Sequence, residues 1–265
     1  MVRLNPHRVD RKHNNTPVLF DREIDDFAQA VLAEYRPSLL REPGAIDFQH
    51  FLESYCGMQI EFKDLYSDDP ERPILAMTVF KTTRVKIFDK ENECVKKITV
   101  PGRRVLIDNS VMEPGRESLA LFSGMHEGGH IKMHWHVHTG ETLEGDVYDP
   151  DYEYAAISPV VCCRRENIES NDPPKKVRTA KEWREHHADY FAAAITMPNR
   201  TFIPFVRGLL RENSYYRSSV TLGVHEDWDI LVNDIIPDAI NEVYGVSKRA
   251  ARIKLRKANI VLGNL

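Results

Sequence analysis

One short run of residues combines histidine and glutamate at a spacing suited to metal chemistry. It reads His126-Glu127-Gly128-Gly129-His130. On a helix, two histidines four residues apart project from one face, about one turn from each other, so both imidazoles can reach one Zn²⁺. Glu127 would lie beside that ion without binding it, in a position to accept a proton from a water molecule. The run predicts a metal site with two ligands and a general base.

Two adjacent glycines interrupt this predicted helix. In a helix interior each costs about 1 kcal/mol relative to alanine. A helix with a purely structural role has no reason to accept that cost. We therefore expect the helix to be approached closely at Gly128 and Gly129, by a sheet or by a substrate.

A second helix supplies a candidate third ligand. The segment Trp183–Pro198 contains Glu185-His186-His187-Ala188-Asp189, in which Glu185 and Asp189 share one helical face. A zinc site with two histidines takes one carboxylate from another element, and benefits from an acceptor that holds a ligand histidine by its other ring nitrogen. We expect Glu185 to be the third ligand and Asp189 to be that acceptor.

Other histidines compete for the third position. His136 has the spacing of a longer motif in which a glycine turns the chain, but Met133 occupies the glycine position. The helix should therefore continue, so that His136 points elsewhere. His134 lies about 6 Å beyond the second ligand, too far for one coordination sphere, and we interpret it as a polar residue on the cleft floor. His186 and His187 are candidate donors to a substrate.

The composition is that of an ordinary globular protein. Of 265 residues, 42% are hydrophobic and 29% are charged, which excludes a disordered, collagen-like or coiled-coil chain. No apolar stretch is long enough to span a membrane, and the N-terminus lacks the apolar region of a secretory signal. Four cysteines form no disulfide framework, which favours the cytoplasm. The net charge of −4 disfavours a protein that coats nucleic acid.

Hydrophobic periodicity predicts an α+β fold in which a small antiparallel sheet packs on helices. Helical spacing covers Asp21–Tyr35, Ile46–Tyr55, residues 117–136 and Ala180–Thr196. Period-two patterns predict strands at Met58–Phe62, Ile74–Phe80, Val85–Phe88, Cys94–Val100 and Val105–Asp108. Turn residues after the third and fourth strands suggest two antiparallel hairpins.

The chain divides into three predicted parts. Residues 1–17 lack periodicity and are expected to form a flexible tail. Residues 18–200 form one domain, with an insertion loop at 138–178 that is rich in acidic residues and contains one strand or short helix. Residues 201–265 form a C-terminal helical segment with a basic end at Ser247–Lys257.

Three segments resemble the ImmA/IrrE family of zinc metallopeptidases, which are gluzincins. They are Val105–Ser110, His126–His134 and Trp183–Pro198, the last of which is similar to the family block E-x-x-A-[DN]-x-F-A-A-x-x-x-M-P. The resemblance covers roughly residues 20–200. It implies a minimal zincin-like core with Zn²⁺ bound by His126, His130 and Glu185, and with Glu127 as the general base.

The resemblance also implies a biological setting. Members of this family typically act inside bacteria, often from mobile elements or stress operons, where they cut or antagonise a helix-turn-helix repressor. This chain departs from the family in two respects. The gap between His130 and Glu185 is long and is similar to a subset whose insertion holds a Cys-Arg element, here Cys163-Arg164. His187 stands where glutamate or glutamine is more usual, which makes it an alternative ligand.

The expected reaction is metal-assisted hydrolysis of a peptide bond, in which Glu127 accepts a proton and passes it to the leaving amine. The oxyanion needs a further donor, for which the candidates are His187, Tyr190, Tyr215, Tyr216 and His225. We also expect the strand at 103–108 to bind an extended substrate along its edge.

A second hypothesis is a DNA- or protein-binding regulator whose zinc is structural. It rests on Gly245-Val246-Ser247 followed by a basic helix, residues 248–257, as in helix-turn-helix proteins. The alternative interpretation of this segment is a terminal helix capped by Ser247 with a solvated basic face. A structural zinc site would be closed by four ligands, whereas the sequence offers three well-placed ones.

Overall fold

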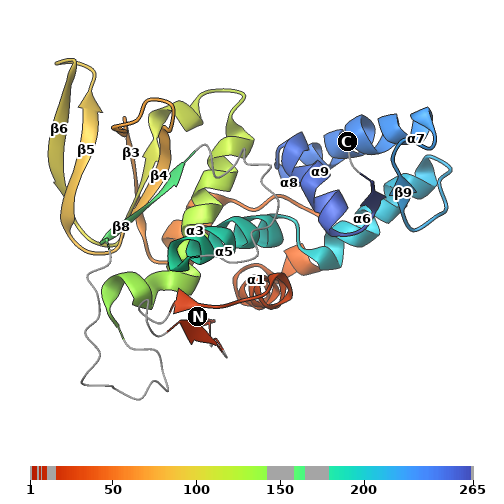
Figure 1. The fold of residues 1–265 in the computed structure, drawn as a ribbon, viewed down its shortest axis with the longest axis horizontal. Coiled ribbons are helices and arrows are strands. Elements are labelled where there is room, and N and C mark those ends of the chain that lie inside the picture. The colour runs from red at the N-terminus through yellow and green to blue at the C-terminus, as the bar shows by residue number, and fades with distance from the viewer. Residues whose placement is uncertain are drawn as a thin grey trace. The chain divides into compact units, whose positions relative to one another are not determined.

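The computed structural model describes residues 2–4, 6, 8–10, 16–141, 158–164 and 179–263. The chain forms two compact units, one of Met1–Ile24 and Phe48–Ala192, the other of Asp25–Asp47 and Ala193–Leu265. Helices α1 (Asp21–Tyr35) and α5 (Ala180–Thr196) each run from one unit into the other (Figure 1). The expected domain boundary at residue 200 lies near the point in α5 where the chain passes from the first unit to the second, after Ala192. The sequence pattern did not indicate that Asp25–Asp47 belongs with the C-terminal segment.

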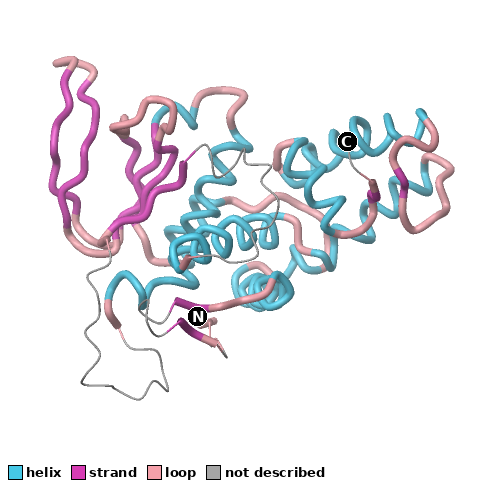
Figure 2. The backbone as a smooth tube through the Cα atoms, in the orientation of Figure 1, coloured by secondary structure: helices cyan, strands magenta, loops and turns pink. Residues whose placement is uncertain are grey.

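A four-stranded sheet forms the centre of the first unit (Figure 2). Its strand order is β3-β7-β4-β8. Strand β7 (Arg104–Asp108) pairs parallel with β3 (Gln59–Lys63) and antiparallel with β4 (Ile74–Val79). Strand β8 (Val160–Arg164) pairs antiparallel with the other edge of β4. The predicted fold class, a small and mainly antiparallel sheet packed on helices, is confirmed, and β8 is the element expected within the insertion.

One of the two predicted hairpins is wrong. Strands β5 (Thr83–Asp89) and β6 (Cys94–Val100) form the first hairpin, as a separate two-stranded sheet. The second was expected between β6 and β7, but β7 lies between β3 and β4. Residues 105–107 of β7 are fully buried, which suits a central strand covered on both faces. Because both edges of β7 are paired, the expectation that this strand binds a substrate along its edge is also wrong.

Helix α3 (Glu117–Thr139) packs against the sheet at β4 and β8. It runs three residues beyond the predicted end and stops at Gly140, whose φ of 72° is the left-handed conformation that ends many helices. Every residue from 123 to 131 is buried, so this part of the helix is covered on all sides. A helix buried on every side in this way must have its polar residues satisfied by its neighbours.

Gly128 and Gly129 of α3 lie where other elements approach the helix closely. A Cβ at Gly129 would be 2.8 Å from the Cα of Ala188 on α5, and one at Gly128 would be 3.0 Å from the Phe51 ring. Phe51 begins the π-helical turn η3 (Phe51–Tyr55), which follows α2 (Phe48–His50). The expected close approach is therefore present, although the neighbour at Gly129 is a helix rather than a sheet.

The remaining short elements of the first unit are β1 (Val9–Asp10), β2 (Thr16–Pro17) and the 3₁₀ turn η4 (Asn109–Met112). Strands β1 and β2 pair antiparallel, so part of the expected tail belongs to a two-stranded sheet. Within the described residues, no helix is long and apolar enough to cross a membrane.

The second unit is mostly helical, as expected for the C-terminal segment. Besides most of α1, it contains η2 (Pro37–Leu40), α6 (Asn199–Glu212), α7 (Glu226–Ile230), η5 (Leu231–Ile235), α8 (Ile236–Tyr244), α9 (Lys248–Lys257) and the parallel pair β9 (Val220–Thr221) and β10 (Val261–Leu262). Its core includes the fully buried Phe202, Ile240, Tyr244 and Leu255.

Replacing Gly129 with alanine should force α3 and α5 apart, because the new methyl group would overlap the Ala188 backbone. We expect the free energy of unfolding to fall by about 1–3 kcal/mol, as measured by urea denaturation. Gly208→Ala is the control, since a Cβ there meets no atom within 4 Å. That helical substitution should raise stability by up to about 1 kcal/mol. Equal losses of unfolding free energy in the two variants would contradict the close contact between Gly129 and Ala188.

Candidate metal centre

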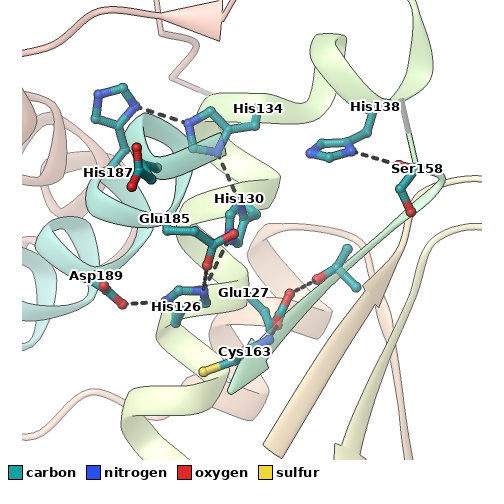
Figure 3. A network of polar contacts seen from close by, with 12 residues as sticks. His126, Glu127, His130, His134, His138, Ser158, Cys163, Glu185, His187 and Asp189 are labelled. Atoms are coloured by element: carbon teal, nitrogen blue, oxygen red, sulfur yellow. Dashed lines mark hydrogen bonds and ion pairs between the residues drawn. The ribbon is translucent and has the colours of Figure 1, made fainter. Parts of the chain in front are cut away.

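Three side chains from α3 and α5 converge in the first unit. His126 and His130 come from α3 and Glu185 comes from α5, and one potential ligand atom from each lies within 4.8 Å of the others (Figure 3). The two histidine Nε2 atoms are 3.1 Å apart. The Glu185 carboxylate oxygens lie 3.6 Å from Nε2 of His126 and 3.8 Å from Nε2 of His130. These are the three residues that the sequence predicts as metal ligands.

The donor set fits a zinc ion. Zinc binds nitrogen and oxygen at about 2.0–2.2 Å, so two ligand atoms of a tetrahedral site are about 3.4 Å apart. The three distances between donor atoms lie close to that value. Both histidines are fully buried, whereas the Glu185 side chain keeps 23% of its surface exposed. The group thus offers three protein donors, fewer than the four of a closed structural zinc site.

Asp189 orients the first histidine ligand. Nδ1–H of His126 donates to the Asp189 carboxylate at 2.8 Å, which leaves Nε2 of the ring facing Glu185 and His130. Burial alone would raise the pKa of Glu185. The two ligand histidines lower that pKa by more, to about 2, so Glu185 is an anionic donor at neutral pH. Asp189 and Glu185 thus occupy the positions expected from their spacing.

The second histidine ligand belongs to a chain of buried imidazoles. The Leu19 amide N–H can only donate, and it lies 3.4 Å from Nε2 of His187. In turn, Nδ1–H of His187 donates to Nε2 of His134 at 3.2 Å, and Nδ1–H of His134 donates to Nδ1 of His130 at 3.1 Å. Burial lowers the pKa of His130 and His134 well below the usual value, so these rings are neutral.

This direction of hydrogen bonding has a consequence for metal binding. If Nδ1 of His130 accepts, then Nε2 of the same neutral ring carries its proton. A metal ion binds imidazole only at a deprotonated nitrogen, so an ion at Nε2 requires the opposite tautomer of His130, with its proton on Nδ1. In that tautomer, Nδ1–H of His130 can donate to Nδ1 of His134.

The remaining histidines lie outside the group of ligands. His134 is one helical turn away, as predicted, and contacts a ligand histidine instead of the metal position. Both ring nitrogens of His187 have partners in the chain of imidazoles, so the alternative of His187 as a ligand finds no support in its contacts. His186 bonds Asp21 at 2.9 Å, and the Tyr190 ring lies 6.1 Å from the His186 ring.

Glu127 is fully buried, and both of its carboxylate oxygens are occupied. The Thr78 hydroxyl of β4 donates to Oε2 at 2.5 Å, and the Cys163 amide of β8 donates to Oε1 at 3.0 Å. Burial raises the pKa of Glu127 to about 7, against the opposing effects of His126 and these two donors. A carboxyl group with this pKa can take up and release a proton near neutral pH.

Sequence reasoning missed both partners of Glu127. Thr78 carries the one hydroxyl group in the apolar strand Ile74–Val79, and this break in the pattern was a usable signal. Cys163 acts through its main-chain amide, so no pattern of side chains could reveal it. Burial raises the pKa of the Cys163 thiol to about 12, which keeps that thiol neutral.

The basic helix α9 of the second unit makes contacts within that unit. Ser247 caps it, accepting a hydrogen bond from the Ala250 amide at 3.1 Å, as one of the two interpretations predicted. Lys248 forms an ion pair with Asp238, and Arg252 donates to the Asn233 carbonyl at 2.6 Å. These basic side chains thus contribute to the packing of the helical unit. Nucleic-acid binding by residues 247–257 stays a prediction.

Comparison with models of protein families, with curated protein sequences and with solved structures gives no significant match for this chain.

The raised pKa of Glu127 predicts how the stability of the metal-free protein depends on pH. In the unfolded chain this carboxyl ionises near its ordinary value of 4.5, but in the folded protein it ionises near 7. The folded state therefore holds an extra proton between these values, and stability falls as the pH rises through this range. Glu127→Gln cannot ionise, and its amide can donate to the Thr78 oxygen.

We expect Glu127→Gln to gain about 2 kcal/mol of stability over the wild type between pH 5 and pH 8. The measurement is urea denaturation of both proteins in the presence of a chelator. Every other ionisable group is shared, so the difference isolates Glu127. A difference that stays constant between pH 5 and pH 8 would contradict the buried, proton-exchanging carboxyl.

Proposed function

We propose that this protein is a zinc-dependent endopeptidase that hydrolyses a protein substrate. The observation that carries the proposal is the group of His126, His130 and Glu185, whose three donor atoms lie at zinc-like separations. Glu127 adjoins this group in sequence and has a pKa of about 7. Metal ligands and a neutral-pH base on one helix are the components of metal-assisted hydrolysis.

Each residue has a defined part in this reaction. A bound zinc ion would supply the Lewis acid that polarises the scissile carbonyl and acidifies water. His126, His130 and Glu185 would hold the ion. Glu127 takes a proton from the attacking water and delivers it to the amine as the peptide C–N bond breaks, so the water adds across that bond.

The number of donors favours catalysis over the alternative of a regulator with a structural metal. Among the residues that the structure describes, one group of three potential ligands is present, whereas a structural zinc site has four. The resemblance of three segments to ImmA/IrrE peptidases makes a helix-turn-helix repressor the first protein substrate to test. Tyr190 remains a candidate donor to the oxyanion in this proposal, whereas both ring nitrogens of His187 already have partners within the protein.

Removing the carboxylate ligand should abolish metal binding. We expect about one zinc per chain in wild-type protein purified without a chelator or a histidine tag, and none in Glu185→Ala. Elemental mass spectrometry measures both. Glu182→Gln on the same helix is the matched control and should keep its zinc. Zinc retained by Glu185→Ala would overturn the assignment of ligands.

Replacing the base should separate binding from catalysis. Glu127→Gln keeps the shape of the side chain but cannot accept a proton, so we expect zinc to stay bound while peptide hydrolysis falls by at least about a hundredfold. The assay follows cleavage of unfolded, fluorescein-labelled casein and of candidate repressors. Undiminished cleavage by Glu127→Gln would remove this residue from the mechanism.

A further inference from the structure

Strand β8 covers the edge of the sheet that adjoins the metal centre. In the order β3-β7-β4-β8, β4 would be an edge strand without it. Both β4 and β8 pack on α3, the helix that carries His126 and His130. In sequence, β8 lies between α3 and α5, and so between the second histidine ligand and Glu185. An exposed edge at β4 would offer unpaired backbone groups to an extended peptide beside the metal ligands.

Strand β8 also makes a direct bond to the proposed base. The Cys163 amide donates to Oε1 of Glu127, and Thr78 of β4 holds Oε2 (Figure 3). A general base has to present an oxygen to the water that it deprotonates. With both oxygens held, Glu127 is kept against the sheet.

Further contacts hold β8 in this position at both ends. At its start, the Phe80 amide donates to the Pro159 carbonyl at 2.9 Å, and His138 donates to the Ser158 carbonyl at 2.9 Å. At its end, Arg164 donates to the Arg72 carbonyl at 2.7 Å. The Cys163 side chain is fully buried. These contacts mark β8 as a specifically docked strand.

We propose that β8 occupies the position of an extended substrate strand and keeps the peptidase latent. A substrate binds by replacing β8 on β4, antiparallel to it, and the loss of the Cys163 bond frees one oxygen of Glu127. The chain's own strand and the substrate are therefore competitors for one sheet edge. This inference rests on the proposed peptidase function and adds a means of regulating it.

A reversible lock on β8 tests the proposal. Met77 on β4 lies directly opposite Cys162 on β8. Opposed residues of antiparallel strands have Cα atoms roughly 4.5–5.5 Å apart, within the range that a disulfide spans. Met77→Cys, combined with Cys94→Ser to remove an exposed thiol, should therefore link the two strands on oxidation. Mass spectrometry identifies the bond.

A second variant releases β8. Cys163→Pro removes the N–H that binds Glu127, and Cys163→Ala, which keeps the N–H and loses only the thiol, is its matched control. Loss of this charge-assisted hydrogen bond should raise the rate of casein cleavage about tenfold in the proline variant. Hydrogen exchange of residues 160–164, followed by mass spectrometry, reports release of the strand independently of cleavage.

The outcomes separate this inference from the proposed function. Support requires that the oxidised lock is inactive, that reduction restores cleavage, and that Cys163→Pro cleaves faster than Cys163→Ala. Equal cleavage by the oxidised and reduced lock overturns the role of β8 and leaves the peptidase intact. If zinc is bound and exchange shows β8 released, yet no form cleaves casein or a repressor, both the peptidase and its latency are overturned.

Discussion

The contact between Gly129 on α3 and Ala188 on α5 is the constraint on which the metal centre depends. A Cβ at Gly129 would lie 2.8 Å from the Ala188 backbone, so only glycine permits this separation of the helices. Ala188 adjoins Asp189 in sequence and follows Glu185 by three residues. The same contact therefore sets both carboxylates against the histidines of α3, one for the metal and one for His126. A glycine in a helix interior costs about 1 kcal/mol relative to alanine. At this position it leaves room for the Ala188 backbone.

Burial is the second determinant of the site's chemistry. His126, Glu127 and His130 have no exposed surface, so each polar atom must find a partner within the protein. Among the described residues, no atom of the metal centre is a buried polar atom without a partner. The same burial brings the pKa of Glu127 to about 7 while the neighbouring histidines keep Glu185 ionised. Two carboxylates on neighbouring helices thus acquire different pKa values from their surroundings.

Strand β8 links the sheet to this chemistry. It closes the edge of β4, and its Cys163 amide holds the carboxylate on which hydrolysis would depend. An edge strand has unpaired N–H and C=O groups that can pair with other chains, and proteins commonly prevent this by covering the edge. In this protein the covering strand also donates a hydrogen bond to the Glu127 carboxylate, so one strand connects the sheet edge with the candidate site.

The sequence by itself determined most of the local elements and which three side chains form the candidate metal group. Helical periodicity carries His126 and His130 on one face, and the i, i+4 spacing does the same for Glu185 and Asp189, because these relations depend only on helix geometry. The sequence could not determine which strands pair. Strand β7 pairs with β3 and β4 instead of β6, because pairing depends on which strand the core buries on both faces. Nor could it reveal the Cys163 amide, the chain of imidazoles from Leu19 to His130, or the membership of Asp25–Asp47 in the helical unit. Those features join residues far apart in sequence through main-chain groups and burial, which only the tertiary structure brings together.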